Sequence, residues 1–296
     1  MKILLTGANG FLGKYISEYF QQKHSVETIG RRSVCNYTCD LANEVPILTS
    51  DFDVVIHAAG KAHIVPKTEK EADDFFKVNH EGTKNLLQAL ENQRLLAFIF
   101  ISTVAVYGLQ KGDNITEKYP LNANDPYGKS KIMAEIAVAE WCSQHNVPCI
   151  ILRLPLLIGL DAPGNLNSMV NGIKRGIYFN ISKGTAKKSM VLASDIPIAI
   201  EKAIGKSGIF NITDGYHPSF KELSTLISSQ LNCRIYSIPY WMAIIVAKLG
   251  DIIGYKFPLD SRKLKKIVSS LTFDDTYAQK ELNWEPHKVL ENFKIK

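Results

Sequence analysis

Residues 1–13 read MKILLTGANGFLG, and this stretch decides the fold of the chain. The apolar run 2–5 predicts a short strand, and glycines 7, 10 and 13 form GxxGxxG directly after Thr6. Gly7 lets the chain leave the strand sharply, Gly10 lets the backbone approach a pyrophosphate, and Gly13 lets the next helix pack close to the sheet. The start of that helix offers free N–H groups and a positive dipole end to an anion. The stretch therefore predicts a dinucleotide-binding site.

The bulk composition is that of a soluble globular protein. The chain has 296 residues, 46% of them hydrophobic and 22% charged, which is enough to bury a sizeable core. The net charge of +6 is spread out, and the densest run, Arg262–Lys266, is typical of a solvated helix face. We therefore expect no nucleic-acid partner, although this charge would suit a phosphorylated, anionic small substrate. The five cysteines are scattered without a CxxC pair, which indicates a reducing compartment and no metal site.

No stretch of the sequence predicts a targeting signal or a membrane span. The apolar run at the N-terminus is too short for a signal peptide and enters the glycine turn. The most apolar later stretch, Trp241–Ile253, contains Lys248 and Asp251 and is too short to cross a bilayer. We interpret it as a buried or interface helix that begins at Pro239. The expected location is cytoplasmic.

Apolar strands alternate with amphipathic helices along the chain, which predicts βαβ units in a parallel sheet. The expected strands are Val26–Ile29, Asp53–Ile56, Ala97–Ile101, Pro148–Leu154 and Gly208–Thr213, and the expected helices are Lys14–Lys23, Phe75–Glu91, Tyr127–Gln144, Phe220–Leu231 (capped by Ser219) and Asp274–Leu282. The fold class is a Rossmann-type doubly wound α/β sheet with a smaller, interleaved C-terminal lobe. Residues 1–160 would form the dinucleotide-binding domain, to which about 190–215 return, and 161–296 would mainly form a second lobe.

The end of the second strand bears on the choice of cofactor. An NAD-specific site places Asp or Glu there to bond the ribose 2′-hydroxyl, but this chain has Gly30 followed by Arg31 and Arg32. Guanidinium groups without a carboxylate favour a 2′-phosphate, and hence NADP(H) over NAD(H). The alternative is that both arginines are solvent-facing loop residues.

Two later strand ends carry further candidates. Asp40-Leu41 follows an extended segment, where the carboxylate would bond the adenine amino group or cap the next helix. Ala58-Ala59-Gly60 follows the strand 53–56, and its small residues let the backbone lie against a cofactor. We interpret His57 as a packed histidine, whereas His63, in the loop beyond, is a candidate for lining a substrate cleft.

Tyr127 and Lys131 are four residues apart on a helix and therefore share a face. Such pairs also occur on solvated helices, but Thr103 ends a buried strand, at the sheet edge where ligands bind. An adjacent ammonium and a positive nicotinamide ring would lower the pKa of the Tyr127 phenol. Lys131 would also hold the nicotinamide ribose, and the Thr103 hydroxyl would bond the reacting sugar oxygen. These groups suit proton removal coupled to hydride transfer at a secondary alcohol, or the reverse.

A set of motifs extends over nearly the whole chain: TGxxGxxG at 6–13, Asp40-Leu41, Ala58-Ala59, Asn79, Thr103, Tyr107-Gly108 and Tyr127-xxx-Lys131. In combination they resemble the extended short-chain dehydrogenase/reductase family, and more narrowly its nucleotide-sugar epimerase/dehydratase branch. The resemblance implies that Thr103, Tyr127 and Lys131 are catalytic and that Asn79 supports them. It also implies cofactor contacts from Phe11, Leu12 and Pro155, and a nucleotide-sugar substrate bound mainly by the lobe 161–296. The resemblance further implies a homodimer built from the helices that carry Asn79 and Tyr127.

Several positions depart from the family pattern. The 4,6-dehydratases of the branch carry an Asp-Glu pair directly after the catalytic threonine, where this chain has Val104 and Ala105. We therefore expect that it is not a 4,6-dehydratase. Leu156 replaces an asparagine of galactose epimerases, and Lys188 stands where the family often has an arginine that grips the substrate pyrophosphate. The expected substrate contacts are His63, Thr103, Val104, Asn165, Lys188 and Arg262.

The sequence leaves the reaction open between two mechanisms at one site. A 4-epimerase would oxidise C4 of the sugar and return the hydride to the other face, whereas a 4-keto reductase would take hydride once from NADPH. Family base rates slightly favour the epimerase, and Gly30-Arg31-Arg32 favours the reductase. A remote alternative is a non-catalytic dinucleotide-binding regulator, a class that typically lacks the tyrosine or the lysine.

Overall fold

A seven-stranded parallel sheet forms the framework of the molecule in a computed structural model that describes residues 1–62, 64–254, 257 and 259–295. The strand order is β11-β7-β5-β4-β1-β2-β3. Their bounds are β1 Lys2–Thr6, β2 Ser25–Gly30, β3 Tyr37–Thr38, β4 Val54–His57, β5 Ala97–Thr103, β7 Cys149–Leu154 and β11 Gly208–Asn211. The order reverses at β1, whose neighbours are β2 and β4, and such a switch point is where doubly wound sheets bind their ligands. The predicted Rossmann-type fold class is confirmed.

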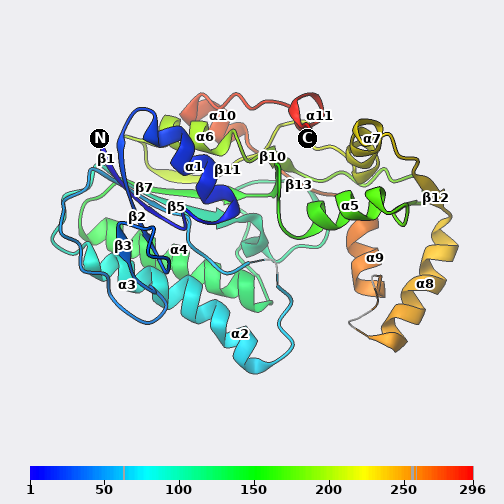
Figure 1. Cartoon of the computed structure of the whole chain (residues 1–296), viewed down its shortest axis with the longest axis horizontal. Coiled ribbons are helices and arrows are strands. Elements are labelled where there is room, and N and C mark those ends of the chain that lie inside the picture. Colours follow the sequence, from blue (N-terminus) through cyan, green and yellow to red (C-terminus); the bar gives the residue numbers. More distant parts are fainter. Residues whose placement is uncertain (63, 255–256, 258, 296) are drawn as a thin grey trace.

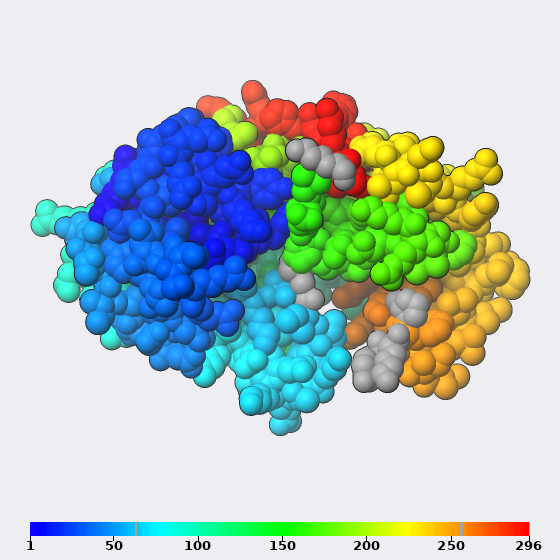
Figure 2. Space-filling view, in the orientation of Figure 1, coloured from blue at the N-terminus to red at the C-terminus, as the bar shows by residue number. Residues whose placement is uncertain are grey.

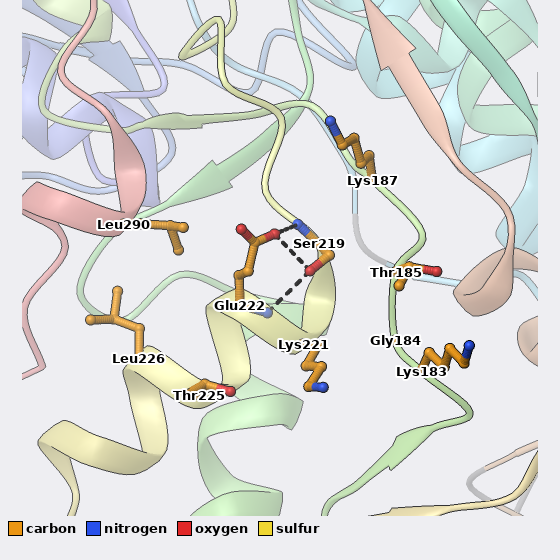
Figure 3. A pocket seen from close by; sticks show the side chains of 10 residues that line it. All are labelled: Lys183, Gly184, Thr185, Lys187, Ser219, Lys221, Glu222, Thr225, Leu226 and Leu290. Carbon is orange, nitrogen blue, oxygen red and sulfur yellow. Dashed lines mark hydrogen bonds between the residues drawn. The ribbon is translucent and has the colours of Figure 1, made fainter.

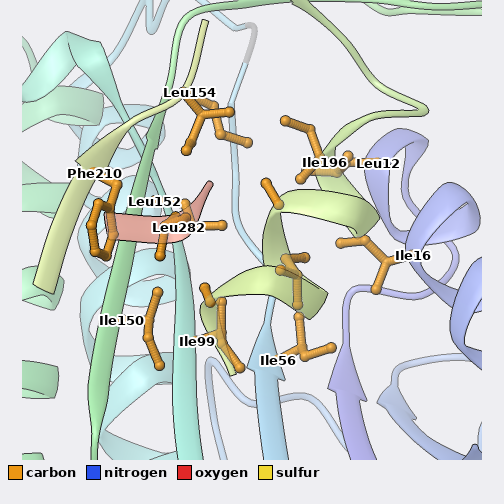
Figure 4. Packing of buried hydrophobic residues seen from close by; sticks show 14 of the residues in the cluster. Leu12, Ile16, Ile56, Ile99, Ile150, Leu152, Leu154, Ile196, Phe210 and Leu282 are labelled. Atoms are coloured by element: carbon orange, nitrogen blue, oxygen red, sulfur yellow. The ribbon is translucent and has the colours of Figure 1, made fainter. Parts of the chain in front are cut away.

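Helices cover both faces of this sheet (Figure 1). On one face lie α1 (Phe11–Gln21), α6 (Ile196–Ala203) and α10 (Thr276–Leu282), and on the other lie α3 (Gly82–Ala89) and α4 (Pro126–Gln144). Successive strand residues point to opposite faces, so Ile99 belongs to the first core, and Phe98 and Phe100 to the second. Figure 4 shows strand residues of the first core, among them Ile99, packed towards α1 and α6.

The predicted helix Phe75–Glu91 is wrong in its start and its continuity. The chain forms α2 (Glu69–Phe76), a π-helical turn at Lys77–Glu81, and then α3. The helix starts early because the Thr68 side chain accepts a hydrogen bond from the Glu71 N–H. Within α2 the one buried residue is Phe75, so the apolar period carried no signal for the first two turns.

The smaller C-terminal lobe consists of short paired strands and helices. Its elements are β8 (Leu156–Ile158), α5 (Asn165–Lys174), β9 (Phe179–Ile181), β10 (Met190–Leu192), α7 (Phe220–Gln230), β12 (Tyr236–Ile238), α8 (Tyr240–Ile253), α9 (Ser261–Val268), β13 (Leu271–Phe273) and α11 (Val289–Asn292). Parallel pairing joins β8 to β10 and β9 to β12, and β13 to β6 (Gly112–Ile115) of the first half. Ser219 caps α7 in a reciprocal capping box with Glu222, as predicted at the N-terminus of this helix.

The chain returns to the large sheet after this lobe has begun, because α6, β11 and α10 all pack with its strands. Figure 2 shows the amino-terminal part (blue to cyan) and the late lobe (yellow to orange) on opposite sides of the molecule. Within the described residues, none of the helices combines the length and the apolar character that crossing a bilayer requires.

Candidate functional site

The turn between β1 and α1 has the geometry of a dinucleotide cradle. Gly7 has φ +75°, and a Cβ on it would lie 2.7 Å from the backbone of Ala58 and Ala59 at the end of β4. A Cβ on Gly13 would lie 2.0 Å from the Gly7 carbonyl oxygen, so neither position tolerates a side chain. The N-cap of α1 is Gly10, and no side chain caps the helix, so its first-turn N–H groups face the turn. These features fit the diphosphate of a dinucleotide.

The other predicted cofactor residues lie in the first turn of α1 or just after strands of the large sheet. Phe11 and Leu12 form the first turn of α1, and Pro155 directly follows β7. Arg31 and Arg32 are exposed just after β2, and Gly60 approaches the Asn79 side chain, since a Cβ on it would lie 3.2 Å from Oδ1.

Asp40 lies in a turn and does not cap a helix. Its Oδ1 accepts the Ala42 N–H at 3.3 Å and its Oδ2 accepts the Asn43 amide at 2.7 Å. The alternative of a cap on the next helix is therefore wrong, since a turn follows. The buried Leu41 places its carbonyl on the Asn85 side chain of α3.

Tyr127 and Thr103 come together from α4 and β5. Asp125 caps α4 by accepting the Gly128 N–H at 3.0 Å, which places Tyr127 in the first helical turn. Burial raises the pKa of the Tyr127 phenol, and a hydrogen bond with the Thr103 side chain opposes that shift. The pKa of Tyr127 is therefore raised and not lowered as expected. The charge of Lys131 is not among the causes of this shift.

Lys131 is buried one turn further along α4. Its Nζ donates to the Ile101 carbonyl at 2.8 Å and lies 3.8 Å from the centre of the Phe100 ring. Burial lowers the pKa of Lys131 to about 7, although the nearby Glu135 carboxylate acts in the opposite direction. The Lys131 side chain therefore titrates near neutral pH, whereas the sequence predicted a permanent positive charge.

Asn79 lies in the π-helical turn, a form that is frequent at functional sites. Its amide donates to the Ser130 hydroxyl at 2.9 Å and to the Lys61 carbonyl, and its Oδ1 accepts the Lys61 N–H at 2.6 Å. The Ser130 hydroxyl in turn donates to the Tyr127 carbonyl at 2.8 Å. Asn79 therefore acts on the helix that carries Tyr127 through Ser130, a residue that sequence reasoning missed.

His57 is packed as predicted, and its ring links β1 to Asn79. The Thr83 hydroxyl donates to the Asn79 carbonyl at 2.6 Å, so its oxygen must accept from His57 Nε2–H at 2.9 Å. His57 Nδ1 then accepts from the Thr6 hydroxyl at 2.6 Å, whose oxygen accepts the Ala59 N–H. Burial lowers the pKa of His57 to about 3 and keeps the ring neutral.

A buried ion pair joins β7 to α4, the helix that carries Tyr127. Arg153 of β7 forms two hydrogen bonds with Glu135 of α4, from Nε at 3.1 Å and Nη2 at 2.7 Å, and Ser102 also donates to Glu135. Arg153 Nη1 further donates to the Tyr107 hydroxyl at 3.1 Å. Glu135 is four residues after Lys131 and eight after Tyr127, and this helical spacing was the available sequence signal for it.

The predicted substrate residues are less tightly gathered. Val104 directly follows Thr103, while Asn165 and Arg262 are exposed on α5 and α9. Burial, and then the charge of Lys266, lower the pKa of Lys188 to about 8. His63 lies outside the described residues. The described residues contain no group of three or more His, Cys, Asp or Glu side chains able to hold a metal ion.

A hollow of about 610 Å³ lies in the C-terminal lobe. Figure 3 shows Lys183, Lys187 and Lys221 around it, with the Ser219–Glu222 capping box at the start of α7. Lys187 lines the hollow and its neighbour Lys188 does not. None of the predicted site residues lines it, so the catalytic assignment rests on the β5–α4 constellation.

The curated relatives of this chain include nucleotide-sugar enzymes. N-acetyl-alpha-D-glucosaminyl-diphospho-ditrans,octacis-undecaprenol 4-epimerase of Escherichia coli O157:H7 is 27% identical over 93% of this chain and 87% of its own. UDP-glucose 4-epimerase of Vibrio cholerae is 27% identical over 99% and 93%. dTDP-D-glucose 4,6-dehydratase of Dictyostelium discoideum is 28% identical, over 71% of this chain and 57% of its own.

Solved structures share the fold over nearly the whole chain. UDP-glucuronic acid 4-epimerase from Bacillus cereus, in complex with UDP-glucuronic acid and NAD, has a TM-score of 0.75 at 19% identity and covers 99% of this chain and 96% of its own. RMD from Pseudomonas aeruginosa, complexed with NADPH, has a TM-score of 0.70 at 20% identity and covers 98% and 96%. The family model described as the NAD dependent epimerase/dehydratase family matches residues 3–212. With the glycine cradle and the Thr103, Tyr127 and Lys131 constellation, this match shows that the chain belongs to the NAD dependent epimerase/dehydratase family.

Proposed function

We propose that this chain is a 4-epimerase of a hexose attached to a diphosphate, with Tyr127 as its acid and base. The observation that carries the proposal is the hydrogen bond between Tyr127 and Thr103, with the buried Lys131 one turn along the same helix. The relatives named as 4-epimerases of UDP-glucose and of N-acetylglucosaminyl-diphospho-undecaprenol support it. Both named substrates carry a sugar on a diphosphate, for which Lys188 is the proposed contact, with Asn165 and Arg262 as further candidates.

In this proposal the chain's own groups hold and move the proton. Tyr127 Oη takes the proton of the C4 hydroxyl and later returns it, while Thr103 holds the same sugar oxygen. A bound nicotinamide cofactor would supply reversible hydride acceptance at C4. The Gly7–Gly13 turn would hold the dinucleotide diphosphate, and Lys131 would hold the nicotinamide ribose. A charged Lys131 would favour the phenolate of Tyr127, and because burial lowers the pKa of Lys131 to about 7, the share of charged Lys131 increases as the pH falls through neutrality.

The finer assignments are proposals on the same site. Val104 and Ala105 offer no acid or base beside Thr103, which favours a reaction other than 4,6-dehydration, even though a dehydratase is among the relatives. The exposed Arg31 and Arg32, with Gly30 in place of an acid, favour NADP(H) and hence the 4-keto reductase as the alternative reaction. We also propose a homodimer through the helices that carry Asn79 and Tyr127, which are the continuous segment from α2 to α3 and α4, and Met133 and Ile136 of α4 are exposed there.

Turnover of soluble nucleotide sugars tests the catalytic assignment. The chain would be incubated with UDP-glucose or UDP-N-acetylglucosamine, and the C4 epimers would be separated by chromatography. Tyr127→Phe should lower kcat by about 10²- to 10⁴-fold and leave dinucleotide affinity intact, because it removes one hydroxyl. Tyr277→Phe, at a half-exposed tyrosine stacked on Phe210, is the matched control. Unchanged turnover in Tyr127→Phe would contradict the assignment, and a wild type that binds dinucleotide without turning over any sugar would favour the regulator.

A further inference from the structure

Lys61 lies in the loop that leaves β4 and forms an ion pair with α2. Its Nζ donates to Asp74 Oδ2 at 2.7 Å and lies 5.4 Å from the centre of the Phe75 ring. The hydrogen bond from Lys61 lowers the pKa of the Asp74 carboxyl, which favours the charged carboxylate. The Lys61 side chain is 20% exposed, so its stem is packed while its ammonium is paired.

The backbone of Lys61 is fixed at the same time. Its N–H donates to Asn79 Oδ1 at 2.6 Å, and its carbonyl accepts from the Asn79 amide at 3.1 Å. The same loop approaches the glycine turn, since a Cβ on Gly7 would lie 2.7 Å from the backbone of Ala58 and Ala59. Lys61 therefore ties the loop beside the cofactor turn to the segment from α2 to α3.

Phe75 links the Lys61 side chain to the Tyr127 ring. It is the one buried residue of α2, and none of its surface is exposed. Its ring packs against that of Tyr127, with the ring centres 6.1 Å apart and the planes inclined at 59°. The other side chains of α2 are exposed or half-buried, so the position of this helix at the site depends on the surroundings of Phe75.

The contact with Phe75 becomes more important when a sugar is bound. In the free chain the Tyr127 phenol also has a hydrogen bond with the Thr103 side chain. In the proposed function both hydroxyls bond one sugar oxygen, so this direct bond is replaced and the ring is held by its packing neighbours. A shift of about 1 Å in a reacting group can cost about 10²-fold in rate. A side chain that fixes Phe75 can therefore affect the rate without touching the substrate.

We propose that Lys61 is a positioning residue for Tyr127. Its backbone acts on helix α4 through Asn79 and the Ser130 hydroxyl, which donates to the Tyr127 carbonyl. Its side chain acts on the Tyr127 ring through Phe75. This role rests on the proposed function, in which Tyr127 is the acid and base.

Kinetics of the full chain with a matched control test this role. Lys2 makes the same two contacts elsewhere, since its Nζ lies 2.8 Å from Glu27 Oε1 and 5.4 Å from the centre of the Phe52 ring. Lys61→Met keeps an unbranched apolar stem and removes the charge. It should lower kcat about 10- to 100-fold and leave KM for the UDP-sugar and the dinucleotide affinity unchanged. Lys2→Met should leave kcat unchanged.

Two further variants separate the ion pair from the stem and from the fold. Lys61→Arg can still pair with the carboxylate and should keep the wild-type kcat. Asp74→Asn breaks the pair from its 44% exposed partner, where a loss of folding is not expected. It should lower kcat as much as Lys61→Met does, and the double variant should lower it no further, because both changes remove one interaction.

A spectroscopic readout makes the test independent of turnover. The chain would be labelled with 3-fluorotyrosine, and the fluorine signal of position 127 would be assigned by its loss in Tyr127→Phe. Lys61→Met should shift or broaden this signal, and Lys2→Met should not. A wild type that converts no UDP-sugar would contradict the proposed function, and the fluorine signal would still decide the role of Lys61. An unmoved signal, an unchanged kcat in Lys61→Met, or equal losses of kcat in Lys61→Met and Lys2→Met would overturn the proposal.

Discussion

The hydrogen bonds on both ring nitrogens of His57 determine its tautomer and its protonation state. With the Thr83 hydroxyl committed to the Asn79 carbonyl, the ring must donate from Nε2 and accept at Nδ1. The pKa falls from the ordinary 6.5 to about 3, so the unfolded chain binds the proton and the folded chain does not. Stability from this group is therefore complete above pH 6.5 and is lost as the pH falls towards 3.

This reasoning predicts how His57→Leu changes the pH dependence of unfolding. At pH 8 the variant should be less stable by about 1–3 kcal/mol, because it leaves buried hydroxyls short of a partner. Towards pH 4 the difference should shrink, since only the wild type gains a proton on unfolding in this range. Urea unfolding at a series of pH values measures both curves, and parallel curves would show that His57 does not titrate as described.

The role of a residue was predictable from the sequence where the residue belongs to a motif. It was not predictable where the role depends on a partner that is distant in the chain. Thr103, Tyr127 and Lys131 follow from a strand end and a helical spacing of four. Ser130, Thr83 and Arg153 gain their roles from contacts with Asn79, His57 and Glu135, which lie 18 to 51 residues away in the chain or on another element. The pKa of Lys131 depends on burial in the same way. No local pattern carries that information.

At the scale of one element, helix α4 has a buried face that carries residues of the candidate site and an opposite face that is exposed. Lys131, Glu135 and Val138 are buried, while Met133 and Ile136, three residues apart, are 40% and 49% exposed. Charged residues at this outer position should disrupt a dimer formed by packing this helix against its copy, because burying an unpaired carboxylate is costly.

We therefore predict that Met133→Glu/Ile136→Glu is monomeric under conditions in which the wild type is a dimer. Sedimentation velocity measures the change. Trp241→Ser/Ile245→Ser/Leu249→Ser is the control, and it should keep the wild-type oligomeric state because these side chains are exposed on α8, in the other lobe. A monomeric wild type, or a dimer that survives both charges, would show that the outer face of α4 is not the interface.

Elements were predicted to within a few residues where apolar period and caps agree, as for β4, β7, α7 and α10. Helix α8 was also predicted, but the choice between a buried and an interface helix depended on its orientation. Its apolar residues occur on every side in sequence, and the three small residues that decide which side is buried, Ala243, Ala247 and Gly250, are recognisable once the packing with α9 is known. The π-helical turn at Asn79 was missed because a single widened turn leaves no trace in an apolar period.

At the scale of the whole molecule, the proposed site uses residues from two parts of an interleaved chain. The large sheet supplies the glycine turn, Thr103 and, through α4, Tyr127, whereas Lys188 and the basic α9 belong to the late lobe. The return of α6, β11 and α10 to the sheet ties the lobe to the cofactor half by several crossings. Binding in either half can therefore be measured as stabilisation of the one folded chain.

The identity of the cofactor predicts the reaction of the whole enzyme. An epimerase regains its hydride in every turnover and can retain one cofactor, whereas a reductase must exchange it. From the exposed Arg31 and Arg32 we expect NADPH to raise the Tm more than NADH does, and Arg31→Gln/Arg32→Gln to remove the difference. Each lost charge-assisted hydrogen bond should weaken NADPH binding about tenfold or more.

Mass spectrometry of nucleotide released on denaturing the purified chain decides between the two reactions. Retained NAD⁺ would show the arginine interpretation to be wrong and would favour the 4-epimerase, because a recycled cofactor has no need to leave. NADP(H), or a site stabilised by NADPH far more than by NADH, would favour the 4-keto reductase and direct the substrate search to 4-keto sugars. Since Arg31 and Arg32 are exposed and lie apart from Tyr127 in the fold, their replacement should change cofactor choice without changing the unliganded Tm.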